Sequence, residues 1–144
     1  PFTDAEKYFL RKEELTGVVQ HVPTPSDERL ARLYKDALAL VYPSLYEGFG
    51  LPILEAFESG CPVVCSRSSS FVEIAGEAAI YFEPKDPASL VRALRQMQSP
   101  DVREQHVLLG RKRADSFSPA RTAEETARLY RTIREDSGNM ASYP

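Results

Sequence analysis

Residues 38–60 read LALVYPSLYEGFGLPILEAFESG and contain the junction from which the rest of the fold can be inferred. The apolar run at 38–42 predicts a buried strand. The apolar segment around Pro52 predicts a helix that begins at Leu51 and ends before Gly60. The turn between strand and helix carries two glycines and leaves several backbone N–H groups without a helical partner. Such a turn is suited to binding an anion.

Two carboxylates flank this turn. Glu47 precedes the helix, and Glu55 lies in its second turn. Carboxylate oxygens accept hydrogen bonds from sugar hydroxyls, and a phosphate group would be drawn to the N–H groups of the turn. The residues alone therefore predict a site for a phosphorylated sugar.

Composition restricts the class of protein. The 144 residues suffice for one domain with a core, and 42% hydrophobic and 27% charged residues are typical of soluble globular proteins. The net charge of -3 argues against nucleic acid as a main partner. No apolar run reaches the roughly 18 residues that a membrane span needs. We therefore expect no nucleic-acid partner and no integral membrane segment. We also expect that Pro1 is not the native start.

The two cysteines, Cys61 and Cys65, are expected to be free and buried. If residues 62–65 are extended, about 13 Å separates the two Cα atoms, more than the roughly 7 Å that a disulfide allows. A metal site is not expected, because His21 and His106 are distant from both cysteines in the sequence. Free thiols fit a cytoplasmic protein.

Strands and helices alternate along the rest of the chain. We expect strands at 18–21, 38–42, 63–65 and 79–82. We expect helices at 4–15, 51–59 and 71–75. Four further helices should each begin after an N-terminal cap, at Thr24, Asp86, Asp101 and Ser118. This order predicts an α/β fold with a parallel sheet covered by helices on both faces, in which 38–42 and 63–65 are central. In such sheets ligands bind beyond the carboxyl ends of the strands. The turns at 21–23, 47–51 and 66–70 should therefore converge on one edge.

Three segments resemble the retaining glycosyltransferases of family 4. They are residues 42–56, 60–64 and 73–79, and the similarity extends from about Val18 to Phe117. It includes the family's pair of glutamates with seven residues between them, here Glu47 and Glu55. The resemblance implies the GT-B architecture, in which two Rossmann-like domains enclose the active site. This chain would form part of the C-terminal domain.

The resemblance also implies roles for single residues. Glu47 matches the catalytic glutamate that lies beside the transferred sugar and contacts its hydroxyls, and Glu55 matches the glutamate that binds the nucleotide ribose. A carboxylate suits a ribose diol because it can accept two hydrogen bonds. The substrate would be a nucleotide-diphosphate sugar, with GDP-mannose as the candidate donor. The family needs no metal, so neither a metal nor another cofactor is expected.

The remaining donor-binding residues are implied in the same way. The backbone N–H groups of Phe49, Gly50 and Leu51 match those that meet the sugar or the diphosphate. Gly48 and Gly50 would allow the close approach and the unusual dihedrals of this turn. The loop expected to touch the base through its backbone consists of Val22 and Pro23.

The similarity covers only part of such an enzyme. Residues 1–136 would form a partial nucleotide-sugar-binding domain and 137–144 a polar tail, while the N-terminal acceptor domain is absent. The Lys-Gly loop and the basic pair that would neutralise the diphosphate are missing too, so we expect this chain alone to be inactive. Its sheet should expose an unpaired edge through which copies associate. The intact parent would transfer a sugar to a glycan, lipid-linked or other hydroxyl acceptor, in the cytoplasm or at the inner face of the membrane.

Other interpretations of the same residues stay open. Glu55 could be a favourable charge near a helix N-terminus, and Glu47 a solvated loop residue. The chain could be a non-catalytic nucleotide-sugar-binding module or a GT-B relative such as a sugar-nucleotide epimerase. A phosphorylase would need a lysine for pyridoxal phosphate, and no lysine here lies in a suggestive motif. A Rossmann-like domain with a Lys-Gly loop upstream in the parent reading frame would indicate a transferase.

Overall fold

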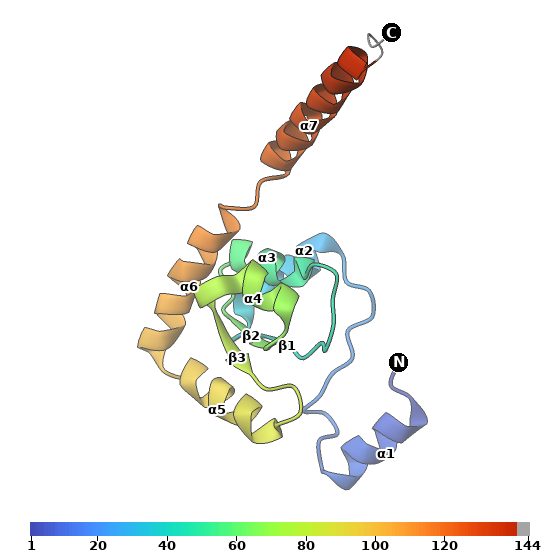
Figure 1. Ribbon diagram of the computed structural model, residues 1–144. Coiled ribbons are helices and arrows are strands. Elements are labelled where there is room, and N and C mark those ends of the chain that lie inside the picture. Colours follow the sequence, from blue (N-terminus) through green and yellow to red (C-terminus); the bar gives the residue numbers. More distant parts are fainter. Residues whose placement is uncertain (141–144) are drawn as a thin grey trace. The chain divides into compact units, whose positions relative to one another are not determined.

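The computed structural model describes residues 1–140, apart from the side chains of Ser69, Pro119 and residues 135–140. Its elements are α1 (Asp4–Lys12), α2 (Asp27–Asp36), β1 (Leu40–Tyr42), α3 (Leu51–Glu58), β2 (Val63–Ser66), α4 (Ser69–Ala75), the 3₁₀ turn η1 (Gly76–Ala78), β3 (Ala79–Phe82), α5 (Pro87–Met97), α6 (Pro100–Ala114) and α7 (Pro119–Met140) (Figure 1). The chain divides into two compact units at Leu33. Of the predicted polar tail, residues 137–140 continue α7 and 141–144 lie outside the described residues.

A parallel sheet forms the centre of the second unit, with the strand order β1-β2-β3. Val63 of β2 pairs with Leu40 on one side and with Ala79 on the other. The predicted parallel α/β fold is therefore confirmed. The prediction that 38–42 is a central strand is wrong, because β1 lies at the edge of the sheet in the part of the chain that the structure describes. Self-association through this edge stays a prediction.

The first unit differs from the prediction in two places. The helix expected over 4–15 already ends at Lys12. The strand expected at 18–21 is wrong: the segment makes only an isolated bridge between Thr16 and Val19. Val18 is 74% exposed, so the apolar pair there has no covered face that would favour a strand.

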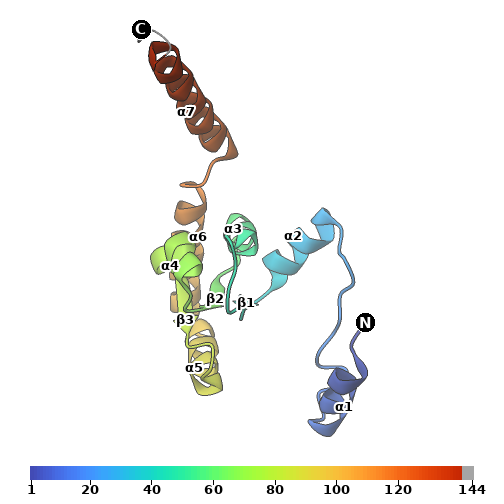
Figure 2. The same ribbon diagram turned by 45° about the vertical axis from the view of Figure 1, so that its right-hand side comes forward.

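Helices cover both faces of the sheet, with α3 above the strands and α5 below them in both views (Figure 2). On one face Val64 and Phe82 pack with Ala93 of α5 in a single hydrophobic cluster. Val63 and Cys65 alternate with Val64 along β2, so they point to the other face, where they are completely buried. Helix α3 contacts both β1 and β2 and packs against α6. The two buried layers hold the ends of β1 and β2 in place.

Both cysteines are free and buried, as predicted. Burial raises the pKa of the Cys61 thiol, and it raises that of Cys65 to about 12. A thiol that stays protonated is a poor nucleophile and a poor metal ligand. The two side chains therefore act as small core residues.

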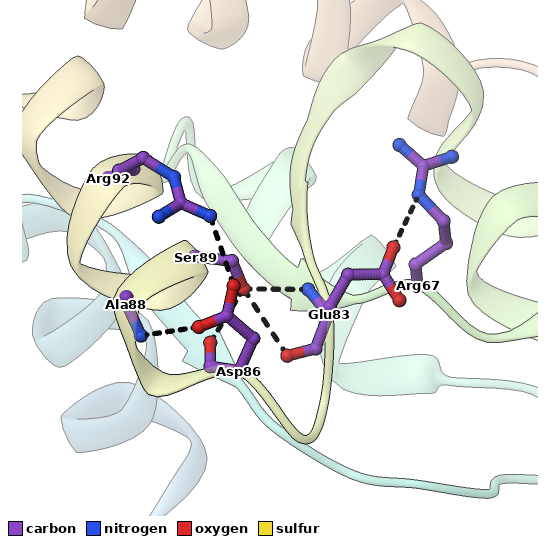
Figure 3. Close-up of polar contacts among 6 residues, drawn as sticks. All are labelled: Arg67, Glu83, Asp86, Ala88, Ser89 and Arg92. Carbon is purple, nitrogen blue, oxygen red and sulfur yellow. Dashed lines mark hydrogen bonds and ion pairs between the residues drawn. The ribbon is translucent and has the colours of Figure 1, made fainter.

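A polar network fixes the chain where it passes from β3 into α5 (Figure 3). The Asp86 carboxylate accepts a hydrogen bond from the N–H of Ala88 at 2.9 Å and pairs with Arg92 at 3.1 Å. Ser89 Oγ accepts from the N–H of Glu83 at 2.9 Å and donates to the carbonyl of Asp86 at 2.7 Å. Desolvation opposes ionisation of Asp86, but the hydrogen bonds from Arg92 and from backbone N–H groups outweigh it and lower the pKa of this carboxyl. The predicted cap at Asp86 is confirmed.

Two other predicted helix starts are displaced. Helix α2 begins at Asp27, and the Oγ of Ser26, not the side chain of Thr24, accepts a hydrogen bond from the first turn. Helix α6 begins at Pro100, so Asp101 lies inside its first turn instead of capping it. In both places proline and polar residues offer competing start signals, which the sequence alone does not rank.

Candidate functional site

The turn between β1 and α3 depends on Gly50. This residue precedes α3 with φ +110° and ψ 43°, a left-handed conformation that only glycine adopts without strain. An added Cβ there would lie 3.2 Å from Cε1 of Phe71, a completely buried ring. At Gly48, by contrast, an added Cβ would meet no atom within 4 Å. Conformation and space therefore both require glycine at position 50, whereas space does not require it at 48.

The turn presents unpaired hydrogen-bond donors. Among the described residues, the N–H groups of Phe49, Gly50 and Leu51 have no protein acceptor. Pro52 has no N–H, and the N–H of Ile53 already bonds to the carbonyl of Gly50 at 3.0 Å. The unpaired donors thus lie together at the beginning of α3, where the helix dipole also favours an anion. Their role in binding stays a prediction.

Glu47 lies in the loop before these donors and is partly buried. Its Oε1 accepts a hydrogen bond from the hydroxyl of Tyr42 at 3.0 Å. Tyr42 ends β1, and its ring stacks on Phe71 with a centroid distance of 5.0 Å. Burial first, and then the hydrogen bond to Glu47, raise the pKa of Tyr42, so the hydroxyl keeps its proton and donates.

Glu55 lies in the second turn of α3 and is exposed. Its Oε2 accepts a hydrogen bond from the hydroxyl of Tyr34 at 3.2 Å. Tyr34 is a buried residue of α2, and burial, followed by the charge of Glu55, raises its pKa to about 12. For the other oxygen of Glu55, and likewise of Glu47, the described residues supply no donor.

Serine side chains link the loop after β1 to the neighbouring strand β2. The Oγ of Ser66, the last residue of β2, donates to the carbonyl of Ser44, and the Oγ of Ser44 donates to the carbonyl of Tyr46 at 3.2 Å. The Oγ of Ser68 is buried and has no hydrogen-bond partner among the described residues. The loop after β1 therefore contacts the carboxyl end of β2 through Ser44 and Ser66. The convergence of the turns at 21–23, 47–51 and 66–70 stays a prediction.

Arg67 is a cation at this edge that the sequence reasoning did not single out. Its Nε lies 3.4 Å from the carboxylate of Glu83 (Figure 3). Its guanidinium lies over the ring of Tyr81 at 5.0 Å from the centroid. Its position directly after a predicted strand is the feature of the sequence from which this cation could have been expected at the edge of the sheet. In this structure its charge is matched by that of Glu83.

A cavity of about 530 Å³ adjoins Glu55. It lies between α3 and the beginning of α7 and is mostly apolar, with Phe49, Leu51, Leu54 and Phe117 among its lining residues. The rings of Phe49 and Phe117 meet edge to face at 6.1 Å. A second cavity, of about 370 Å³, lies between α6 and the segment of α4 and η1 and shares no residue with the site.

The structure brings most of the predicted site residues into one segment of the second unit: Glu47, Gly48, Phe49, Gly50, Leu51 and Glu55. Val22 and Pro23 belong to the first unit, so their contact with a base stays a prediction. Among the side chains that the structure describes, no group of three or more from histidine, cysteine, aspartate and glutamate could hold a metal ion. None of the described helices has the length and apolar character needed to cross a membrane.

Similarity to known proteins agrees with this geometry. A family model described as glycosyl transferases group 1 matches residues 2–111. The chain is 37% identical over 118 residues to O-antigen chain mannosyltransferase B of Escherichia coli, covering 81% of this chain and 31% of that protein. It is 40% identical over 110 residues to the MMP alpha-(1->4)-mannosyltransferase of Mycolicibacterium hassiacum, covering 73% and 27%. The chain thus spans less than a third of the length of these two relatives.

Solved structures show the same fold. The sucrose-phosphate synthase of Thermosynechococcus elongatus superposes with a TM-score of 0.81 at 28% identity, over 90% of this chain and 34% of that one. WaaG, a glycosyltransferase involved in lipopolysaccharide biosynthesis, superposes with a TM-score of 0.67 at 22% identity, over 85% and 35%, which supports the fold alone. This chain spans about a third of the length of each of these two structures. The chain belongs to the glycosyl transferases group 1 family.

Proposed function

We propose that this chain is the donor-binding part of a retaining glycosyltransferase that moves a sugar from a nucleotide-diphosphate sugar to a hydroxyl acceptor. The proposal rests on the arrangement of hydrogen-bonding groups in the segment from Glu47 to Glu55. It presents unpaired N–H groups at 49–51 between two carboxylates, and each carboxylate is anchored by a tyrosine hydroxyl. The Escherichia coli relative is named a mannosyltransferase, so we propose GDP-mannose as the first donor to test.

The chemistry divides among these groups. The N–H groups at 49–51 would bind the diphosphate and stabilise the charge that develops on it as the sugar departs. Glu55 would accept hydrogen bonds from the ribose diol, and Glu47 from the hydroxyls of the transferred sugar. In this scheme no metal takes part.

The acceptor would bind outside this chain. We propose an intact enzyme that consists of this chain together with the acceptor-binding domain that the family resemblance implies. That domain would hold a glycan or lipid-linked acceptor and exclude water. The cations that the diphosphate needs would come from the Lys-Gly loop and the basic pair of a complete nucleotide-sugar-binding domain. We place this enzyme in the cytoplasm or at the inner face of the membrane, and we expect this chain alone to be inactive.

Substitution of Glu55 tests the proposal. In the intact enzyme, Glu55→Gln keeps the shape of the side chain but weakens a charge-assisted hydrogen bond to ribose, which should cost about 1.5–3 kcal/mol of GDP binding. Titration calorimetry with GDP measures this change. Glu58→Gln is the matched control, because it removes an exposed charge from the same helix, and it should leave the affinity unchanged. Unchanged affinity in Glu55→Gln would contradict the ribose role and leave the surface-charge interpretation.

A second candidate is a nucleotide-sugar-binding module without catalysis. One observation favours it: Arg67, a cation at the carboxyl end of β2, forms an exposed ion pair with Glu83. An assay with radiolabelled GDP-mannose and the intact enzyme separates the two candidates. Transfer above background supports the enzyme, whereas GDP binding without transfer or donor hydrolysis supports the module.

A further inference from the structure

Two tyrosine hydroxyls, from different elements, each donate to one of the two glutamates of the site. We propose that Tyr34 and Tyr42 are positioning residues, each of which holds one oxygen of its glutamate so that the other oxygen faces the donor. This inference rests on the proposed function and adds two side chains to it. Tyr34 would act on nucleotide binding through Glu55, and Tyr42 on sugar transfer through Glu47.

The Tyr42 hydroxyl is held rigidly. Tyr42 ends β1, and its ring stacks at 5.0 Å, with an interplanar angle of 29°, on Phe71. Phe71 is completely buried, and the same ring limits the space beside Gly50. One buried ring therefore supports both the tyrosine that orients Glu47 and the turn that carries the N–H groups. Movement of the Tyr42 hydroxyl away from Glu47 would require this packing to change.

The Tyr34 hydroxyl is constrained by burial. Its ring belongs to α2, and its hydroxyl reaches Glu55 on α3, which lies 21 residues further along the chain. Burial raises the pKa of Tyr34 to about 12, so the hydroxyl keeps its proton throughout the physiological range. The neighbouring carboxylate is the acceptor for that proton. Glu55, although exposed, therefore has one oxygen in a defined place.

A neutral donor suits a carboxylate that must bind hydroxyl groups. An arginine or lysine at the same place would neutralise the glutamate and would also compete for the phosphates of the donor. A tyrosine hydroxyl fixes one oxygen but adds no charge, so the carboxylate remains a strong acceptor. Both glutamates of the site are held by a tyrosine hydroxyl. We infer that the function of each tyrosine is to orient its glutamate without neutralising the charge.

The Tyr34 role is tested by nucleotide binding in the intact enzyme. Tyr34→Phe should weaken GDP binding by about 3- to 10-fold, since one hydrogen bond that orients a charged group is lost. The probe for the mechanism is 2′,3′-dideoxy-GDP, which lacks the ribose hydroxyls that Glu55 would bind. Its affinity should be the same for Tyr34→Phe and the wild type. Because both ligands are measured on the same protein sample, partial unfolding would lower both apparent affinities and cannot imitate this pattern.

The Tyr42 role is tested by kinetics. Tyr42→Phe should lower kcat for transfer from GDP-mannose by about 3- to 10-fold, because Glu47 loses its orientation toward the sugar. Its dissociation constant for GDP, which lacks the sugar, should stay unchanged. Tyr81→Phe is the matched control: its hydroxyl donates to the carbonyls of Gly76 at 2.6 Å and Phe71 at 3.4 Å, not to a carboxylate, and burial also raises its pKa to about 12. This control should change neither quantity.

The outcomes separate the inference from the proposed function. If Glu55→Ala weakens GDP binding and Tyr34→Phe does not, the positioning role is overturned while the ribose site stands. If Glu55→Ala leaves GDP binding unchanged, the ribose site is wrong and the Tyr34 role is wrong with it. Equal weakening of GDP and 2′,3′-dideoxy-GDP by Tyr34→Phe would show a structural role only. In the Glu55→Ala background, Tyr34→Phe should have no further effect, and an additional loss would contradict action through Glu55.

Discussion

Replacement of Gly50 by alanine should destabilise the protein by about 2–5 kcal/mol. The left-handed φ of +110° costs a non-glycine residue about 1–2 kcal/mol. The new Cβ would also lie 3.2 Å from Cε1 and 3.3 Å from Cδ1 of Phe71. That ring is completely buried and stacked on Tyr42, so it cannot move aside freely, and overpacking of this kind costs about 1–3 kcal/mol.

Equilibrium unfolding in urea, followed by far-ultraviolet circular dichroism, measures the loss. Gly48→Ala is the matched control two residues away, because its Cβ would meet no atom within 4 Å. Its free energy of unfolding should be unchanged or higher by up to about 1 kcal/mol, through the reduced entropy of the unfolded chain. Equal unfolding free energies for Gly50→Ala and Gly48→Ala would refute both the left-handed conformation and the contact with Phe71.

Three further predictions concern the core. Phe57→Ala removes a ring that is 1% exposed and should cost about 3–5 kcal/mol in urea unfolding; a loss below 1 kcal/mol would mean that the ring is not packed. Cys61 and Cys65 should react with Ellman's reagent at pH 8 only after unfolding, because burial raises both pKa values; rapid labelling of the folded protein would contradict this. The free energy of unfolding should fall as pH rises from about 9 toward 12, because folded Cys65 and Tyr34, each with a pKa of about 12, keep protons that the unfolded chain releases. Urea titrations at a series of pH values measure this change, and a free energy of unfolding that rises over this range would contradict the prediction.

Local patterns in the sequence are sufficient for most of the fold. Helix α3 lies where Pro52 and Gly60 bound an apolar run, and β3 spans the predicted residues 79–82. These elements could be predicted because their signals lie within a few residues of each other. The strand expected at 18–21 could not be judged in this way, because a strand needs a partner and a covered face as well as apolar residues. For the same reason the place of β1 at the edge of the sheet was not predictable.

The two glutamates of the site could be predicted from the sequence, but the tyrosine hydroxyls that bind them could not both be predicted. The pair Glu47 and Glu55 and the glycines between them are visible as spacing in the chain. The hydrogen bond from Tyr34 to Glu55 joins two helices, and no local pattern indicates it. The contact between Tyr42 and Glu47 could have been expected, because Tyr42 ends a strand only five residues before Glu47. No local pattern indicates that the ring of Phe71 lies against both Tyr42 and Gly50, because the three residues come from different segments.

The proposed donor site depends on binding of the diphosphate by the N–H groups of Phe49, Gly50 and Leu51. Backbone amide NMR of the isotope-labelled intact enzyme, titrated with GDP and separately with guanosine, tests this claim most directly. We expect GDP to shift these three amide signals in a saturable way, with the dissociation constant found by calorimetry, and guanosine to leave them unchanged. The buried Gly110 of α6 serves as the internal control and should not shift. If calorimetry detects GDP binding but the three signals do not shift, the phosphate binds elsewhere and the proposed role of these N–H groups is wrong.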